Sequence, residues 1–385
     1  MLYESDRLTT LKPDDKAETD DGFLTFGVRA NLKEAGRIET DLSYRHREVS
    51  NSFLSSLPIS SFKDRRNLST WGFTPKYILE KPLGEHSNKI TFGLDYYHSN
   101  SNVDSESFFF GSTTFDATEV TKKSFGLYLL DEFSILTNLM LSLGGRWEWV
   151  TYDVSQDLSG VDDRKRDSEP AWNVGLNYIL GKGSSAFLSV KRSFRFPVSD
   201  EFIQFIFSPP TFQPTIQINS AMKPQIGYHY EAGIRYALND WMEGNLTLFW
   251  IDLQDEIFYN PLTFSNENYP KTRRQGIEVG LKTKPLSWLH VWGNYGYVRP
   301  TLRGESFSGN DIPGVSRHKG SIGTDIHMGK GFLFNARANL IGPRRFISDW
   351  GNQIGRLDGY YTLDAKLSYT WKGFKAFVGV NNITN

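Results

Sequence analysis

The chain has 385 residues, and its 43 Lys and Arg balance 44 Asp and Glu to a formal net charge of −1. This balance excludes the concentrated positive charge of a nucleic-acid-binding protein, and the absence of cysteine excludes a disulfide scaffold or a thiolate metal site. Aromatic residues make up 15% of the chain. Apolar runs stay well short of the roughly 18 residues of a membrane-spanning helix. A transmembrane β-barrel remains compatible, because alternate residues of its strands face water.

Period-two alternation predicts strands throughout the first half of the chain. In residues 21–33, Leu24, Phe26 and Val28 alternate with polar residues. Side chains two positions apart on a strand share a face, so one face is apolar and the other is polar. The same pattern predicts strands at 36–47, 68–80, 88–99, 121–135, 138–152, 170–181 and 184–193.

The alternation is clearest in the second half, and residues 360–381 show it best. Tyr361 and Trp371 bound an apolar face there, and a tight Lys372-Gly373 turn joins the two strands. Further strands are predicted at 227–238, 242–257, 274–284, 288–299, 316–328 and 331–341. The pattern gives about sixteen strands, or seventeen if residues 1–11 form one. It predicts an all-β fold, an antiparallel transmembrane β-barrel.

The predicted connections alternate between short turns and long loops. Long loops are expected near 48–67, 100–120, 153–169, 194–226, 258–273, 300–315 and 342–359. Short periplasmic turns and long extracellular loops are typical of outer-membrane barrels. The strand at 373–381 starts at a short turn, runs outward and leaves an edge unpaired. We therefore expect an incomplete barrel, since an open edge in lipid is costly.

Four stretches resemble the β-barrel of TonB-dependent outer-membrane receptors. They are residues 194–202 (FRFPVSDEF), 219–235 (NSAMKPQ followed by YEAGIR), 274–279 (RQGIEV) and 377–383 (FVGVNNI). The second departs from the family pattern, with Met222 in place of Leu and Gln225 in place of Glu. Four such stretches in the family's order make the resemblance specific to the barrel.

The resemblance implies a 22-stranded barrel around an N-terminal plug domain. Residues 1–385 are then a barrel domain with about 16–17 of those strands, truncated at both ends and without the plug. The implied location is a Gram-negative-type outer membrane, in contact with its lipid. The implied partners are a small-molecule ligand and the TonB–ExbB–ExbD complex, reached through the plug region. The protein is expected to act as a monomer and to bind no nucleic acid.

The polar face of the predicted strands carries both signs of charge, which suits a water-filled interior. The resemblance implies that part of this face contacts the plug. A simpler reading is solvation of the interior and pairing between strands. The candidate plug-facing residues are Arg146, Glu148, Glu231, Arg235, Glu278, Arg337 and Asp364.

The predicted loops are unusually aromatic, and one of them carries two adjacent arginines. Such side chains suit a vestibule for an apolar ligand, and the arginines suit an anionic one such as a ferric siderophore. The alternative is packing between loops that closes the top of the barrel, with charges that are only solvated. The candidate ligand-binding residues are Phe108, Phe109, Phe110, Phe205, Phe207, Phe212, Tyr259, Arg344, Arg345 and Trp350.

No catalytic constellation is visible in the sequence. The seven histidines lack metal-ligand spacing, and neither a Gly-rich phosphate loop nor a Gly-x-Ser-x-Gly motif occurs. We therefore expect no enzyme activity, no metal site and no cofactor. The predicted function is active uptake of a scarce ligand such as a ferric siderophore, cobalamin or haem. A passive porin or channel and a surface adhesin are the alternatives.

Overall fold

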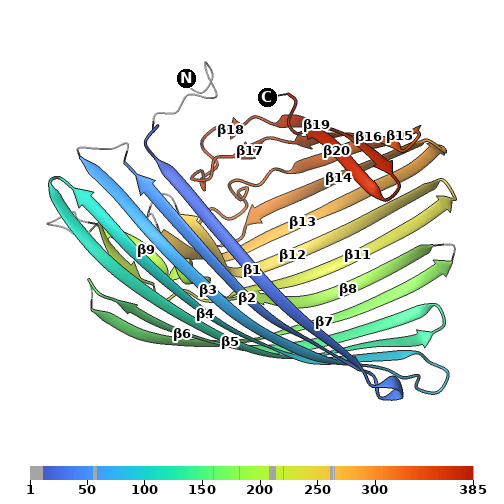
Figure 1. Cartoon of the computed structure of the whole chain (residues 1–385), viewed down its shortest axis with the longest axis horizontal. Coiled ribbons are helices and arrows are strands. Elements are labelled where there is room, and N and C mark those ends of the chain that lie inside the picture. Colours follow the sequence, from blue (N-terminus) through green and yellow to red (C-terminus); the bar gives the residue numbers. More distant parts are fainter. Residues whose placement is uncertain are drawn as a thin grey trace.

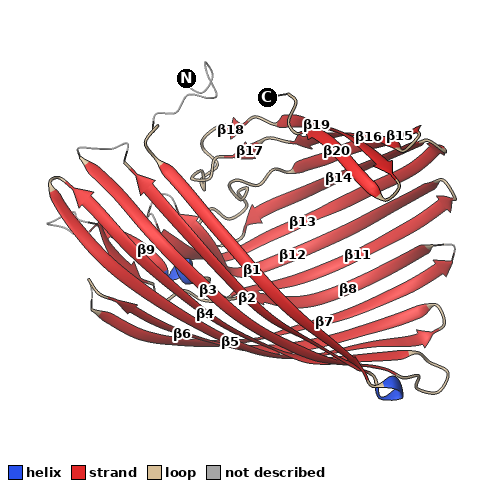
Figure 2. Cartoon of the chain, in the orientation of Figure 1, coloured by secondary structure: helices blue, strands red, loops and turns tan. Residues whose placement is uncertain are grey.

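A computed structural model describes residues 12–54, 59–158, 160–181, 183–207, 214–219, 221–260, 263, 265–304 and 306–384. Within them, strands account for nearly all regular structure (Figure 2), beside two short 3-10 helices, η1 (Lys33–Ala35) and η2 (Ser199–Phe202). No helix in this part of the chain is long and apolar enough to cross a membrane.

Sixteen strands form one antiparallel sheet in which neighbours in space are almost always neighbours in the chain. In spatial order they are β1 (Lys16–Asn31), β2 (Arg37–Phe53), β3 (Ser60–Glu80), β4 (Asn88–Phe109), β5 (Ser112–Leu136), β6 (Leu139–Gln156), β7 (Val161–Gly181), β8 (Ser184–Arg195), β11 (Gln225–Asn239), β12 (Met242–Asn260), β13 (Ser265–Leu286), β14 (Leu289–Leu302), β15 (His318–Gly329), β16 (Phe332–Ile341), β19 (Tyr360–Trp371) and β20 (Phe374–Val380). The predicted all-β antiparallel fold and its strand number are confirmed. The optional strand at 1–11 lies outside the described residues.

The sheet curves into an open trough (Figure 1). Its two edge strands are β1 and β20, and no pairing joins them within the described residues. Two small sheets lie in the connections between strands of the main sheet: β9 (Ile203–Phe207) pairs with β10 (Pro214–Ile218), and β17 (Arg344–Arg345) pairs with β18 (Arg356–Leu357).

The convex, outer face of the sheet is the apolar one. Phe26 is 66% exposed and Leu248 is 52% exposed, which fits side chains that meet lipid rather than water. Two rows of exposed aromatic residues bound this band. Trp71, Trp149 and Trp250 mark one side, and Trp241, Trp288 and Trp371, beside the short turns, mark the other. These rows correspond to the aromatic girdles of a membrane barrel.

Four of the predicted long loops are wrong, because residues 48–67, 100–120, 153–169 and 258–273 mostly continue the paired strands. Strand β5 reaches 25 residues, whereas about 9–11 residues cross the bilayer. Beyond the membrane both faces of a hairpin meet water, so the apolar alternation fades while backbone pairing continues. The β4–β5 hairpin closes tightly at Phe110 and Gly111, with φ values of 46° and 88°.

The remaining long connections at the long-strand end are 303–317, 342–359 with the β17–β18 pair, and 196–224 with η2 and the β9–β10 pair. At the other end the turns are short, as predicted. Lys372 and Gly373 have φ values of 44° and 83°, the left-handed conformation that two-residue hairpin turns require.

Candidate functional site

A charged cluster lies on the concave, inner face of the sheet, at the level of the membrane. Arg146 donates hydrogen bonds to Asp95 at 2.5 Å and to Glu148 at 2.6 and 2.9 Å. Gly126 provides the room for this guanidinium, because a Cβ atom there would lie 2.3 Å from Arg146 Nη2. Strands β4, β5 and β6 thus hold one cation between two carboxylates, which neutralises much of their repulsion.

Most of the other predicted interior residues bond polar side chains along or across strands. Glu231 bonds Lys191 at 2.9 Å, Arg235 bonds Glu243 at 2.7 Å, Arg337 and Asp364 each bond Asn339, and Glu278 lies opposite Thr247 and Gly296. These contacts show what the side chains do within the sheet. Contact with a plug stays a prediction.

Both ends of the connection 196–224 pack onto the inner face of the sheet above this cluster. Phe196, Phe202 and Met222 are 6%, 2% and 1% exposed. They pack against inward-facing side chains of β5 and β6 in a core that comprises Val120, Val150, Tyr152, Val154 and Ile257. This inward packing was not predicted, although the 194–202 stretch that carries it was singled out.

Polar contacts hold the start of this connection against the wall. The backbone oxygen of Pro197 accepts hydrogen bonds from Tyr152 Oη at 2.7 Å and Lys122 Nζ at 3.3 Å. Arg195 pairs with Glu201 at 2.9 Å. Burial lowers the pKa of Lys122 and raises that of Tyr152. Both shifts reflect the low-dielectric surroundings of this contact.

The connection joins β8 to β11, and its end is hydrogen-bonded to β7 on one side of this strand pair and to β13 on the other. Asn268 of β13 accepts from the Lys223 backbone at 2.8 Å and donates to its carbonyl at 3.0 Å. On β7, Lys165 donates to the backbone oxygen of Met222. The carboxylate of its neighbour Asp167 lies 3.6 Å from Lys165 Nζ, and burial raises the pKa of Asp167. The two ends of the connection, at 196–202 and 221–224, are therefore an integral part of the inner wall.

A second core joins the connections 303–317 and 342–359. Tyr269, Leu302 and Ile312 are buried, with Phe258 and Trp350 packed against them. The Trp350 ring lies 4.4 Å from Phe258 and 5.4 Å from Tyr269 between centroids. The predicted residue Trp350 thus has a packing role, and ligand contact by it stays a prediction.

The arginines of these connections are largely matched to carboxylates. Asp311 accepts from Arg317 at 2.5 Å and from Arg356 at 2.9 Å. Arg345 lies 3.5 Å from Asp349 and donates to the Ile354 carbonyl. Arg344 stacks over the Tyr360 ring at 5.6 Å. Three buried donors here, Arg317 Nε, Arg345 Nε and Trp350 Nε1, have no acceptor, which leaves capacity for water or an anion.

The predicted residues Phe108, Phe109 and Phe110 lie at the end of a strand and a hairpin tip rather than in a long loop. Phe108 and Phe109 end β4, and Phe110 at the tip is 73% exposed. The rings of Phe109 and Phe110 lie 4.7 Å apart. Tyr259, on β12, is 48% exposed. Phe205 and Phe207 belong to the backbone of β9, and Phe212 lies outside the described residues. Ligand contact by all of these residues stays a prediction.

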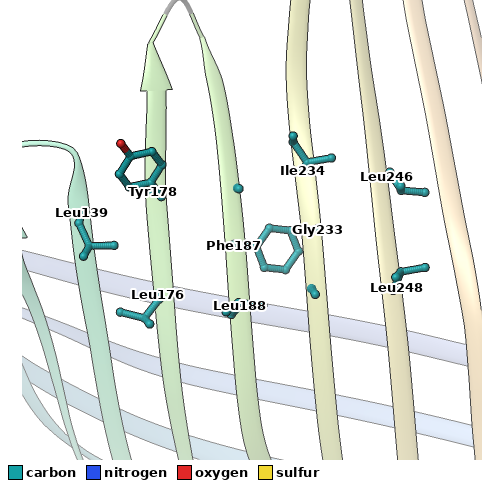
Figure 3. A pocket seen from close by; sticks show the side chains of 11 residues that line it. Leu139, Leu176, Tyr178, Phe187, Leu188, Gly233, Ile234, Leu246 and Leu248 are labelled. Carbon is teal, nitrogen blue, oxygen red and sulfur yellow. The ribbon is translucent and has the colours of Figure 1, made fainter.

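A hollow of about 440 Å³ lies away from this inner surface. Ala186 and Ala232 leave it between larger side chains of the outer face, including Leu176, Leu188 and Leu248 (Figure 3). On a membrane-facing surface, acyl chains fill such a depression. Among the described residues, no group of three His, Asp or Glu side chains has the geometry of a metal site.

These features define a transmembrane β-barrel protein in which connections between strands pack onto the inner surface at one end. The profile of the TonB dependent receptor-like β-barrel family matches residues 3–383, and the chain belongs to this family. Its members and structural neighbours are outer-membrane proteins, which confirms the predicted family and location.

The similar proteins are transporters and receptors. The chain is 22% identical over 256 residues to the ferrichrome outer membrane transporter/phage receptor of Escherichia coli, covering 64% of this chain and 32% of that protein. It is 24% identical over 275 residues to the ferrioxamine receptor of Yersinia enterocolitica, covering 68% and 35%. The unliganded ferric citrate transporter FecA superposes with a TM-score of 0.81 at 18% identity, over 99% of this chain and 59% of the other. The chain thus spans about a third of the length of these curated relatives.

Proposed function

We propose that this chain forms the barrel of a receptor that takes up a scarce ligand across the outer membrane with TonB-derived energy. The observation that carries the proposal is the connection 196–224, seated on the inner wall between the extracellular end and the Arg146 cluster. A ligand arriving from outside meets this element before it reaches the Arg146 cluster. Relatives that bind ferrichrome and ferrioxamine favour a ferric siderophore as the ligand, with haem or cobalamin as further candidates.

In this proposal the two ends of the inner surface have different roles. The extracellular end, with Phe109, Phe110 and the Arg344 guanidinium, supplies aromatic and cationic contacts for a ferric chelate. The Arg146 cluster faces a plug domain that the TonB–ExbB–ExbD complex moves. Residues 1–385 act as the barrel domain around that plug, in a monomeric receptor without catalytic activity.

A passive channel is the second candidate, because an inward-packed connection also suits the constriction of a porin. Uptake of radiolabelled ferrichrome and ferrioxamine separates the two, measured in cells whose own siderophore receptors are deleted. Saturable uptake that requires both this protein and TonB supports active transport. Uptake that rises linearly with concentration and persists without TonB identifies a channel and refutes the proposal.

A further inference from the structure

Two histidines meet on the inner face of the sheet, beside the short turns at its periplasmic end. His290 lies at the start of β14, and His327 lies near the end of β15. The strand register places Asp325 opposite His290. Asp325 and His327 are two positions apart, so the three side chains share one face. It is the inner face, because Asn335, opposite Asp325 on β16, alternates in step with the inward-facing Arg337.

The two imidazole rings have the spacing of two ligands of one metal ion. Their centroids lie 5.0 Å apart, with an angle of 60° between the ring planes. An ion at about 2.0–2.1 Å from a ring nitrogen lies about 3.2 Å from the ring centre, so two imidazoles at a tetrahedral angle have centres about 5.2 Å apart. The observed separation of the His290 and His327 rings therefore fits an ion held between them without movement of either strand.

Asp325 supplies a third ligand within reach of this pair. As the side chains stand, the three groups do not form a complete metal site, and the Asp325 carboxylate accepts a hydrogen bond from Asn335 Nδ2 at 2.6 Å. Residues directly opposite each other have Cβ atoms about 4.5–5.5 Å apart, so rotation of this short side chain moves its carboxylate from Asn335 toward His290. His327 is exposed and His290 is half-buried, which leaves room for an ion and its water ligands.

We propose that His290, His327 and Asp325 bind a divalent transition-metal ion at the periplasmic end of the inner wall. Two imidazoles and one carboxylate suit Cu²⁺, Ni²⁺ and Zn²⁺, whereas Ca²⁺ and Mg²⁺ prefer sites made only of oxygen ligands. Cu²⁺ binds most tightly of the three to such a ligand set. The bound ion ties β14 to β15 next to their turns, and water completes its coordination. The site is separate from the extracellular contacts of the proposed uptake function.

The test measures metal binding by protein purified from outer membranes and stripped of metal. Calorimetric titration with Zn²⁺ gives affinities, and electron paramagnetic resonance with Cu²⁺ counts the imidazole nitrogens bound to the ion. The ligand variants are His290→Gln, His327→Gln, their double variant and Asp325→Asn. Asn335→Ala frees the Asp325 carboxylate, and His46→Gln, at an exposed histidine of β2, is the matched control. A heat-dependent gel shift verifies that each variant is folded.

Loss of a residue that only supports a metal ligand lowers affinity about 10–100-fold, so loss of either imidazole should lower Zn²⁺ affinity about a hundredfold or more. Asp325→Asn should lower it about tenfold, while Asn335→Ala and His46→Gln should bind at least as tightly as the parent protein. The Cu²⁺ spectrum should show two imidazole nitrogens in the parent and one in either single histidine variant. Parent-like Zn²⁺ affinity in the double variant overturns the proposal, because the metal then binds elsewhere. Displacement of Zn²⁺ by equimolar Ca²⁺ also overturns it.

Discussion

The inward packing of the connection 196–224 depends on Phe202, and Phe202→Ala tests it. This ring is 2% exposed and lies 4.7 Å from the Tyr152 ring in an edge-on arrangement. Lys165 Nζ lies 5.6 Å from its centroid. Truncating a buried phenylalanine costs about 3–5 kcal/mol through lost burial and the cavity left behind. The barrel wall is held separately by its strand pairing, so the loss should fall on local docking of the connection.

Hydrogen exchange of backbone amides measures directly whether the connection stays packed against the wall. The Asn219 amide donates to the Phe202 carbonyl at 2.8 Å, and the Met222 amide donates to the Asn219 carbonyl at 3.3 Å. In Phe202→Ala these amides should exchange about a hundredfold faster or more, while amides of β6 stay protected. Phe110→Ala, at a residue that is 73% exposed, is the matched control and should change neither. Unchanged exchange at Asn219 in Phe202→Ala would refute the reasoning.

Three further predictions concern packing, charge and pH. Gly276→Ala places a Cβ 2.1 Å from the Tyr297 carbonyl oxygen and should cost about 1–3 kcal/mol in urea unfolding; Gly145→Ala, with open space around it, should cost far less. Asp311→Asn weakens two ion pairs and should speed proteolysis of 303–317, unlike a substitution of exposed Asp358. Burial raises the pKa of Asp167, so the stability this group contributes is present below its unfolded value and lost as pH rises through the folded one. Stability relative to Asp167→Asn should therefore fall as the pH rises above about 4, the unfolded pKa of aspartate, and a constant difference would contradict this.

Local sequence determined the strands and the direction of their side chains in the membrane band. Alternation places Phe26 outward and Arg146 inward whichever strands lie beside them, because the period of two is a property of the backbone. The Lys372-Gly373 turn could also be predicted from the sequence, because a tight hairpin needs residues that accept positive φ. Outside the membrane this signal fails. Both faces of Phe108–Phe109 and its neighbours meet water, so strand and loop look alike in sequence.

Only the tertiary structure decided which inward side chains meet and where the aromatic segments pack. Arg146 and Asp95 are 51 positions apart, and the register of three strands brings them together. The stretch 194–202 contains Arg195, Phe196 and Phe202, and composition alone fits a ligand-binding loop or a buried one. Its location follows from Val150 and Tyr152, which point inward and offer an apolar surface next to the connection. The burial of these side chains depends on contacts with neighbouring strands, so the sequence of one strand does not determine it.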